Sequence, residues 1–217
     1  MSPAVVIDAI RTPIGRADAR AGCFRDVRSD ELSASLITEL VGRTAIDPAL
    51  IEDVRWGCVQ QQGEQGYDIA RIAALMAGLP IETAGVTINR NCASSLQAIN
   101  DSAMSIMAGC ENVQIAGGVE HMHHIPMTKD YDPAPGLFRK YSEAIMHMGL
   151  TAEYLATKYG IGRSEQDEFA CRSHQLASDA TSSGAFDTEV IPTWGRDDSD
   201  RKTTITRDQC IRDDCSI

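Results

Sequence analysis

The sequence predicts an α/β fold in which a parallel-rich sheet lies between helices. Short apolar runs with strand character alternate along the chain with stretches whose apolar residues recur at helical spacing. This alternation is typical of parallel sheets, because parallel strands need long crossover connections that are usually helical. Four strands are expected, at residues 4–9, 54–59, 86–88 and 113–116. Ligands of such sheets bind beyond the carboxyl ends of the strands, so a functional site is expected there.

Three helices are expected between these strands. The first covers residues 29–42, where Ser29 can cap the amino end. The second covers residues 68–77, and the third begins at Cys92 and closes at Gly109. Each is long enough to cover one face of a sheet.

The pattern changes after the fourth strand. Residues 121–142 are rich in His, Pro, Gly and aromatic side chains and have no sustained period, which predicts an irregular excursion. Two helices and then two short strand-like pieces are expected to follow, at residues 149–158, 164–183, 189–192 and 203–206. The second half is therefore expected to be mainly α-helical.

The most informative segment is VTINRNCASSLQ, residues 86–97. An apolar strand ends in polar residues, and Cys92 follows them directly before small residues and a helical stretch. The pattern places Cys92 in the first turn of a helix. Unpaired backbone N–H groups and the helix dipole favour an anion there, so a thiol loses its proton more easily. Cys92 is therefore the candidate nucleophile.

The alternative interpretation is that Cys92 is an inert core residue. Cysteine is among the most buried residue types, and the chain contains seven. Small side chains beside Cys92 would let a substrate approach closely, which favours the nucleophile. The local pattern alone leaves both interpretations open.

Several blocks of the chain resemble one known family, in the family's order. The segment around Cys92 is similar to the active-site stretch of thiolases, which are acetyl-CoA and 3-ketoacyl-CoA acyltransferases. Four further blocks carry the resemblance, at residues 5–27, 56–80, 117–127 (GGVEHMHHIPM) and 147–177. Together they cover nearly the whole chain. The motifs VEHM (residues 119–122) and HIPM (residues 124–127) resemble those of the degradative thiolases, which act in fatty acid β-oxidation.

The resemblance implies a thiolase N-terminal core at residues 1–118 and an inserted, α-rich loop domain at residues 119–217 that covers the acyl-CoA. It implies that Cys92 attacks a 3-ketoacyl-CoA and that a second coenzyme A collects the acyl group from the acyl-cysteine. His147 and Met148 match the residues that flank the pantetheine arm, so both are expected to bind substrate. Coenzyme A and acyl-CoA are expected as substrates, with no tightly bound cofactor.

Other parts of the family's chemistry have no counterpart in the sequence. Thiolases carry an activating histidine in a Gly-His-Pro motif, an Asn-Glu-Ala-Phe motif and a second catalytic cysteine near the C-terminus. The chain contains neither motif, and Cys210 and Cys215 lie in an acidic segment that does not match. The resemblance therefore implies an N-terminal half with the C-terminal half absent. Such a fragment is expected to be catalytically incomplete alone and to expose apolar faces.

Composition argues against several other functions. A formal net charge of −11 disfavours binding to nucleic acid or to anionic membranes, and no apolar run is long enough to span a bilayer. His121, His123 and His124 lack the spacing of a metal site and are expected to line a turn. An odd number of cysteines without a CxxC pair indicates reduced thiols and a cytoplasmic location.

Three alternative functions stay open. The segment NCASSLQA (residues 91–98) also resembles the turn that carries the nucleophile in decarboxylating ketoacyl synthases, a related family of condensing enzymes. A non-catalytic fragment that binds acyl-CoA or a partner subunit is the second alternative. An unrelated cysteine hydrolase is the third, although no local Cys/His pair supports it. The thiolase resemblance also implies a homo-oligomer, a dimer or tetramer, and a β-oxidation hydratase/dehydrogenase subunit as a further partner.

Overall fold

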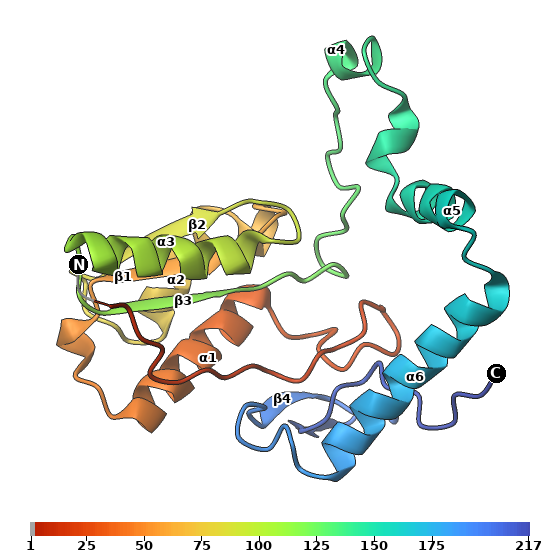
Figure 1. The fold of residues 1–217 in the computed structure, drawn as a ribbon. Coiled ribbons are helices and arrows are strands. Elements are labelled where there is room, and N and C mark those ends of the chain that lie inside the picture. Colours follow the sequence, from red (N-terminus) through yellow and green to blue (C-terminus); the bar gives the residue numbers. More distant parts are fainter. Residues whose placement is uncertain (1–2) are drawn as a thin grey trace. The chain divides into compact units, whose positions relative to one another are not determined.

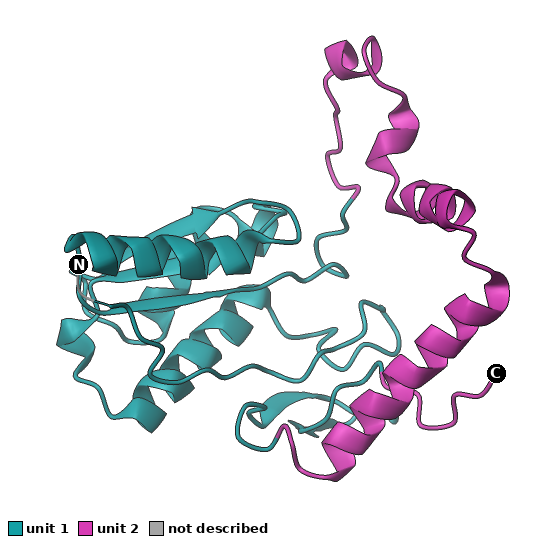
Figure 2. Cartoon of the chain, in the orientation of Figure 1, with its two compact units in different colours: residues 1–127, 187–210 teal, residues 128–186, 211–217 magenta. Residues whose placement is uncertain are grey.

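A computed structural model describes residues 3–217 of the protein. The chain contains two compact units, which Figure 2 shows in different colours. Unit 1 runs to Met127 and resumes over Asp187–Cys210, and unit 2 comprises Thr128–Phe186 and Ile211–Ile217. These units describe compactness, whereas the expected division into residues 1–118 and 119–217 concerns family domains and stays a prediction.

Unit 1 is built on a three-stranded parallel sheet in the order β2-β1-β3 (Figure 1). The strands are β1 (Asp53–Gly57), β2 (Ala84–Ile88) and β3 (Gln114–Gly118). The helices that accompany them are α1 (Ser29–Thr44), α2 (Ile69–Met76) and α3 (Ser94–Ala108). Trp56 on the central strand is paired in register with Thr87 and Gly117 on the strands to either side. The three predicted helices and three of the four predicted strands are present.

The side chains of β1 alternate between the two faces of the sheet. Val54 and Trp56 are buried in a core with residues of α1 and α2, and the Trp56 Nε1–H donates to Ser33 Oγ at 3.1 Å. Gly57 lies on the other face, against the start of α3. Apolar side chains that complete the core include Ile37, Ile51, Ile69, Ala73, Leu79 and Ile115. The sheet therefore lies between helices, which confirms the predicted fold class.

A short hairpin completes unit 1. Its strands, β4 (Thr193–Arg196) and β5 (Lys202–Ile205), pair in antiparallel fashion. The Arg196 N–H donates to the Cys23 carbonyl at 2.8 Å, and the Arg11 guanidinium forms ion pairs with Glu189 at 2.8 Å and Asp208 at 2.7 Å. These bonds attach residues 187–210 to the amino-terminal part of the chain. Single-turn 3₁₀ helices lie at Pro48–Leu50 and Gly63–Gln65.

Unit 2 is helical. Its elements are α4 (Pro135–Phe138), the 3₁₀ helix η3 (Glu143–Met146), α5 (Met148–Tyr159) and α6 (Arg163–Ser182). The two longer helices lie where the sequence predicts them. The Gly162 N–H donates to Glu165 Oε2 at 2.8 Å and closes the first turn of α6. Within residues 3–217, no helix is both long enough and apolar enough to cross a membrane.

Two expected strands are wrong. Residues 4–9 form no strand, and Val5, Val6 and Ile7 in that segment are 74%, 79% and 71% exposed. An apolar run becomes a strand only where the edge of another strand pairs with it. In the described residues, the nearest β-bridge to this segment is an isolated one between Arg11 and Val190. The strand expected at residues 189–192 begins instead at Thr193.

Candidate active site

Cys92 lies at the carboxyl edge of the sheet. β2 ends at Ile88, three polar residues follow, and the exposed Cys92 precedes the first residue of α3, Ser94, by two positions. The expectation that Cys92 belongs to the first helical turn is therefore wrong by two residues. The cause is local, because Asn91 adopts a left-handed conformation with a φ of 50° and turns the chain before the helix begins.

Hydrogen bonds within the corner hold this turn. Ser94 Oγ accepts from the Arg90 N–H at 2.8 Å and donates to the Asn91 carbonyl at 2.6 Å. The Ala93 N–H donates to the Arg90 carbonyl at 3.2 Å. Ser94 is buried, so its hydroxyl joins both sides of the turn away from water. Cys92 is one of the exposed residues of this turn, so its thiol is accessible.

Exposure distinguishes Cys92 from the core cysteines. Burial raises the pKa of the Cys58 thiol to about 12 and that of the Cys23 thiol to about 11, so both stay protonated at neutral pH. Cys92 and Cys110 are exposed at opposite ends of α3. Cys92 lies just before the amino end of the helix, and Cys110 lies just beyond its carboxyl end. The interpretation of Cys92 as a buried core residue is therefore wrong.

Two glycines bring the start of α3 onto the sheet. A Cβ atom at Gly57 would overlap the backbone of Ser95, and one at Gly118 would overlap the Ser95 hydroxyl. Gly57 and Gly118 are register partners at the ends of β1 and β3. The amino end of α3 therefore packs against bare strand backbone, which fixes the position of the corner that carries Cys92.

The exposed surface of α3 carries several large apolar side chains. The residues that the helix buries are small, namely Ser94, Ala98 and Ser102. Its large apolar side chains are exposed instead, and they include Leu96, Ile99, Met104 and Met107. This arrangement inverts the usual amphipathic pattern of a surface helix. It agrees with the expectation that apolar faces are left without a partner.

His121 and His124 form a stacked pair in unit 1, with ring centroids 3.8 Å apart. His124 Nδ1 lies 2.9 Å from Glu64 Oε1, and His124 Nε2 lies 2.7 Å from the Arg25 carbonyl. Both partners are acceptors when Glu64 is ionised, so they favour the form of the ring that carries a proton on both nitrogens. Burial opposes the charged ring, but the bonds to Arg25 and Glu64 outweigh it and raise the pKa of His124. Burial lowers the pKa of His121.

The contacts of this pair are those of a structural turn. His121 donates its backbone N–H to Gln65 Oε1 at 2.7 Å, and its Nε2 lies 3.1 Å from the Phe24 carbonyl. Protein groups thus occupy the positions around the rings, as expected for histidines that line a turn. In the part of the chain that the structure describes, no group of three or more His, Cys, Asp or Glu side chains is arranged to hold a metal ion.

The candidate substrate-binding residues His147 and Met148 lie in unit 2, whereas Cys92 lies in unit 1. His147 caps the amino end of α5, where its carbonyl accepts from the Thr151 N–H at 3.1 Å. Met148 is the first residue of α5 and is 76% exposed. Both side chains are accessible at a helix start, and their role in substrate binding stays a prediction.

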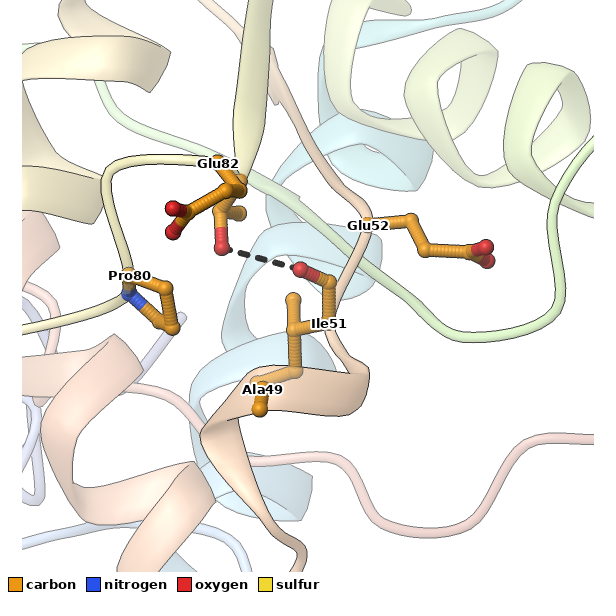
Figure 3. A pocket seen from close by; sticks show the side chains of 6 residues that line it. Ala49, Ile51, Glu52, Pro80 and Glu82 are labelled. Carbon is orange, nitrogen blue, oxygen red and sulfur yellow. Dashed lines mark hydrogen bonds between the residues drawn. The ribbon is translucent and has the colours of Figure 1, made fainter.

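A hollow of about 340 Å³ lies in unit 1 (Figure 3). Its lining includes Glu52 and Thr83, which directly precede β1 and β2. It therefore lies at the amino ends of the strands, whereas Cys92 follows a carboxyl end. Glu82 adds a second carboxylate to the lining, which disfavours an anionic ligand such as coenzyme A.

The fold and the corner define an α/β domain that presents an exposed thiol beyond the carboxyl edge of a parallel sheet. Residues 4–217 match the family model described as the thiolase N-terminal domain. The chain therefore belongs to the thiolase family, and it corresponds to the N-terminal domain of that family. This establishes the predicted family and fold.

Named relatives agree with this assignment. The chain is 48% identical over 214 residues to a 3-ketoacyl-CoA thiolase of Saccharophagus degradans, covering 98% of this chain and 54% of the relative. A 3-ketoacyl-CoA thiolase of Vibrio cholerae is 46% identical, with 100% and 56% covered. The crystal structure of the Bacillus anthracis acetyl-CoA acetyltransferase matches with a TM-score of 0.81 at 34% identity, covering 98% of this chain and 56% of that one. The chain thus spans about half the length of the relatives it matches.

Sequence reasoning missed the polar side chains that hold the strand ends together. Asn89 and Glu120 each lie just beyond the end of a strand, and Gln65 is fully buried beside them in the hydrogen-bond network. Their position in the sequence could have identified them, because polar residues directly after buried parallel strands lie at the carboxyl edge of the sheet, where ligands bind.

Proposed function

We propose that the chain is the nucleophile-bearing part of a thiolase that acts on 3-ketoacyl-CoA in fatty acid β-oxidation. The observation that carries this proposal is the exposed Cys92 thiol at the amino end of α3, in a chain of the thiolase family. The names of the relatives, 3-ketoacyl-CoA thiolases, support the substrate class. Activity, substrates and partners of the whole enzyme are part of the proposal.

In the proposed reaction, the Cys92 thiolate attacks the keto carbonyl of a 3-ketoacyl-CoA. The bond between the α and β carbons breaks, the departing acetyl-CoA carbanion takes a proton, and an acyl-cysteine remains. A second coenzyme A thiol then attacks the thioester, so that shortened acyl-CoA leaves and the Cys92 thiol is restored. The reverse direction is a condensation. A thioester intermediate suits this chemistry because it keeps the acyl group activated.

Unit 1 carries the candidate nucleophile, and no base is hydrogen-bonded to its thiol in the residues that the structure describes. The rings of its stacked histidines are bonded instead to Glu64, Arg25 and Phe24. Proton transfer to and from the thiol and the carbanion needs positioned acid/base groups. We therefore expect the 217-residue chain alone to form the acyl-cysteine feebly and to turn over little.

The other components follow from the same proposal. Acyl-CoA and coenzyme A are substrates, and no tightly bound cofactor takes part. His147 and Met148 would flank the pantetheine arm, with residues 119–217 as a loop domain beside a core at residues 1–118. A homo-oligomer, with a β-oxidation hydratase/dehydrogenase subunit as a further partner, and a cytoplasmic location complete the proposal. The exposed apolar face of α3 supports an associated rather than a monomeric state.

The test compares acyl donors. The chain is mixed separately with acetoacetyl-CoA and with malonyl-CoA, and the intact protein is weighed, beside Cys92→Ala and Cys110→Ala variants. The proposal predicts an acetyl adduct from acetoacetyl-CoA that is lost in Cys92→Ala and kept in Cys110→Ala. Decarboxylation of malonyl-CoA would favour the condensing-enzyme alternative. Coenzyme A binding without any adduct at Cys92 would favour the non-catalytic fragment.

A further inference from the structure

Val59, two residues beyond the end of β1, forms hydrogen bonds through both its backbone N–H and its backbone carbonyl. Val59 lies just beyond β1, and its N–H donates to Glu120 Oε2 at 2.8 Å. Its carbonyl accepts from Asn89 Nδ2 at 3.0 Å. Glu120 follows β3 and Asn89 follows β2, so side chains from the two flanking strands bind one residue after the central strand. The three strand ends are thereby joined through Val59.

Glu120 is itself fixed in place. Its Oε1 accepts from the Gln65 side chain at 2.8 Å and from the Gln60 N–H at 3.3 Å. Gln65 is fully buried, and its own oxygen accepts from the His121 N–H at 2.7 Å. Both carboxylate oxygens of Glu120 therefore have donors, and together these bonds define the orientation of the side chain.

Asn89 connects this arrangement to the candidate nucleophile. While its Nδ2 donates to Val59, its Oδ1 accepts from the Asn91 N–H at 3.0 Å. Asn91 holds a left-handed conformation, which asparagine adopts more readily than most other L-residues, and Cys92 follows it directly. One amide side chain therefore bridges the end of the central strand and the left-handed residue before the thiol.

The two hydrogen bonds of Asn89 require a side chain with both a donor and an acceptor, as an amide has. The side chain must donate to a carbonyl and accept from an N–H at the same time, which asparagine does with its two different terminal atoms. A carboxylate at this position would place an acceptor against the Val59 carbonyl, and an apolar side chain would leave both backbone groups without this partner.

We infer that Asn89 is a positioning residue that holds Cys92 in its presented conformation, by binding Val59 and Asn91 at once. The inference rests on the proposed role of Cys92 as nucleophile. Asn89 acts through the backbone and is not itself expected to touch the substrate. Glu120 supports it by fixing the other side of Val59.

The test measures the reactivity of Cys92 inside the folded chain. Wild type, Asn89→Ala, Glu120→Gln and the control Asn100→Ala are treated with iodoacetamide across a pH series. Peptide mass mapping gives the alkylation rate of Cys92 and, in the same sample, of Cys110 at the other end of α3. Asn100 is an exposed residue of α3, so it controls for substitution of an asparagine near the corner. Thermal unfolding shows which variants are folded.

The wild type is expected to alkylate Cys92 about threefold faster than Cys110, because only Cys92 is presented next to the amino end of the helix. In Asn89→Ala the ratio of the two rates is expected to fall toward one, and the pH dependence of the Cys92 rate to change with it. Glu120→Gln places an amide donor against neighbouring donors and is expected to give a smaller change of the same sign. Asn100→Ala is expected to keep the wild-type ratio.

The experiment separates a failure of the positioning role of Asn89 from a failure of Cys92 as the nucleophile. Wild-type ratios and pH profiles in folded Asn89→Ala would overturn the positioning role, while the proposed nucleophile would stand. A wild-type ratio of one would count against the nucleophile itself. If Asn89→Ala does not fold, Glu120→Gln decides, because a folded Glu120→Gln variant with an unchanged ratio and pH profile contradicts the role of the bridge through Val59.

Discussion

Gly57 and Ser95 are in such close contact that no side chain fits between β1 and α3. The amino end of the helix thus lies directly on the backbone of the central strand. Because Cys92 is attached to that end, the position of the thiol depends on the absence of a Cβ at Gly57. The same reasoning holds for Gly118, which meets the hydroxyl of Ser95.

Replacing Gly57 by alanine is expected to push α3 off the sheet. The added methyl group would overlap the Ser95 backbone, which lowers the free energy of unfolding by about 1–3 kcal/mol. Urea denaturation measures this change. Gly42→Ala is the matched control, since nothing lies near a Cβ there and the position is helical, so it should raise stability by roughly 0.5–1 kcal/mol. Equal effects at both glycines would contradict the close packing at Gly57.

Ser33→Ala is expected to leave the buried Trp56 indole N–H without its acceptor. An unsatisfied buried donor costs about 1–3 kcal/mol of unfolding free energy. Ser35, on the exposed side of the same helix, provides the control, and Ser35→Ala should change stability by about 0.5 kcal/mol or less. Chemical denaturation compares the two variants, and a Ser33→Ala chain as stable as the control would rule out the bond.

His124 is expected to stabilise the fold mainly at acid to neutral pH. Its pKa is raised in the folded state, so the charged ring contributes fully below the ordinary value of about 6.5, and the contribution is lost as pH rises through the folded-state pKa. The difference in unfolding free energy between wild type and His124→Gln should therefore be larger at about pH 5.5 than at about pH 8.5. Denaturation at both pH values measures it.

His121 should show the opposite sign. Burial lowers its pKa, so the neutral ring stabilises the fold above about pH 6.5 and this contribution is lost as pH falls through the folded-state pKa. The difference in unfolding free energy between wild type and His121→Gln should therefore become smaller toward acid pH. If the two variants showed parallel pH dependences, the pKa values of the stacked rings would not be shifted in opposite directions.

The apolar face of α3 is expected to drive self-association of the chain. Leu96→Gln with Met104→Gln should lower concentration-dependent association in sedimentation velocity, because both side chains lie exposed on that face. The unfolding free energy should change little, since neither side chain is in the core. Met122→Gln, which alters an exposed apolar residue outside α3, should leave association unchanged. If it has the same effect, the association does not depend on α3.

The sequence predicted the layered architecture because strand and helix periods are local signals. It also placed Cys92 correctly at the end of β2, from the change of an apolar run to polar and small residues. It did not predict that residues 4–9 stay out of the sheet, since strand formation depends on a partner edge remote in sequence. The bridge from Asn89 to Val59 was also missed, because residues 30 positions apart carry no common local signal.

The start of α3 was misplaced by two residues for a further reason. Helical period extends back to Cys92 in the sequence, but the left-handed Asn91 and the bonds of Ser94 delay the helix. Backbone conformations of single residues are decided by such contacts rather than by composition. The mechanistic consequence is that Cys92 lies on a turn before the helix, where it is exposed.

The role of Cys92 as the nucleophile is tested by locating the acyl group after the chain has reacted with acetoacetyl-CoA. Peptide mass mapping would compare acetyl occupancy at Cys92 with that at the other exposed thiols, Cys110 and Cys210. Acetyl is expected to accumulate at Cys92 and to be removed by added coenzyme A. Equal acetylation of the three thiols, or an adduct at Cys92 that coenzyme A does not remove, would rule out Cys92 as the nucleophile of the acyl transfer.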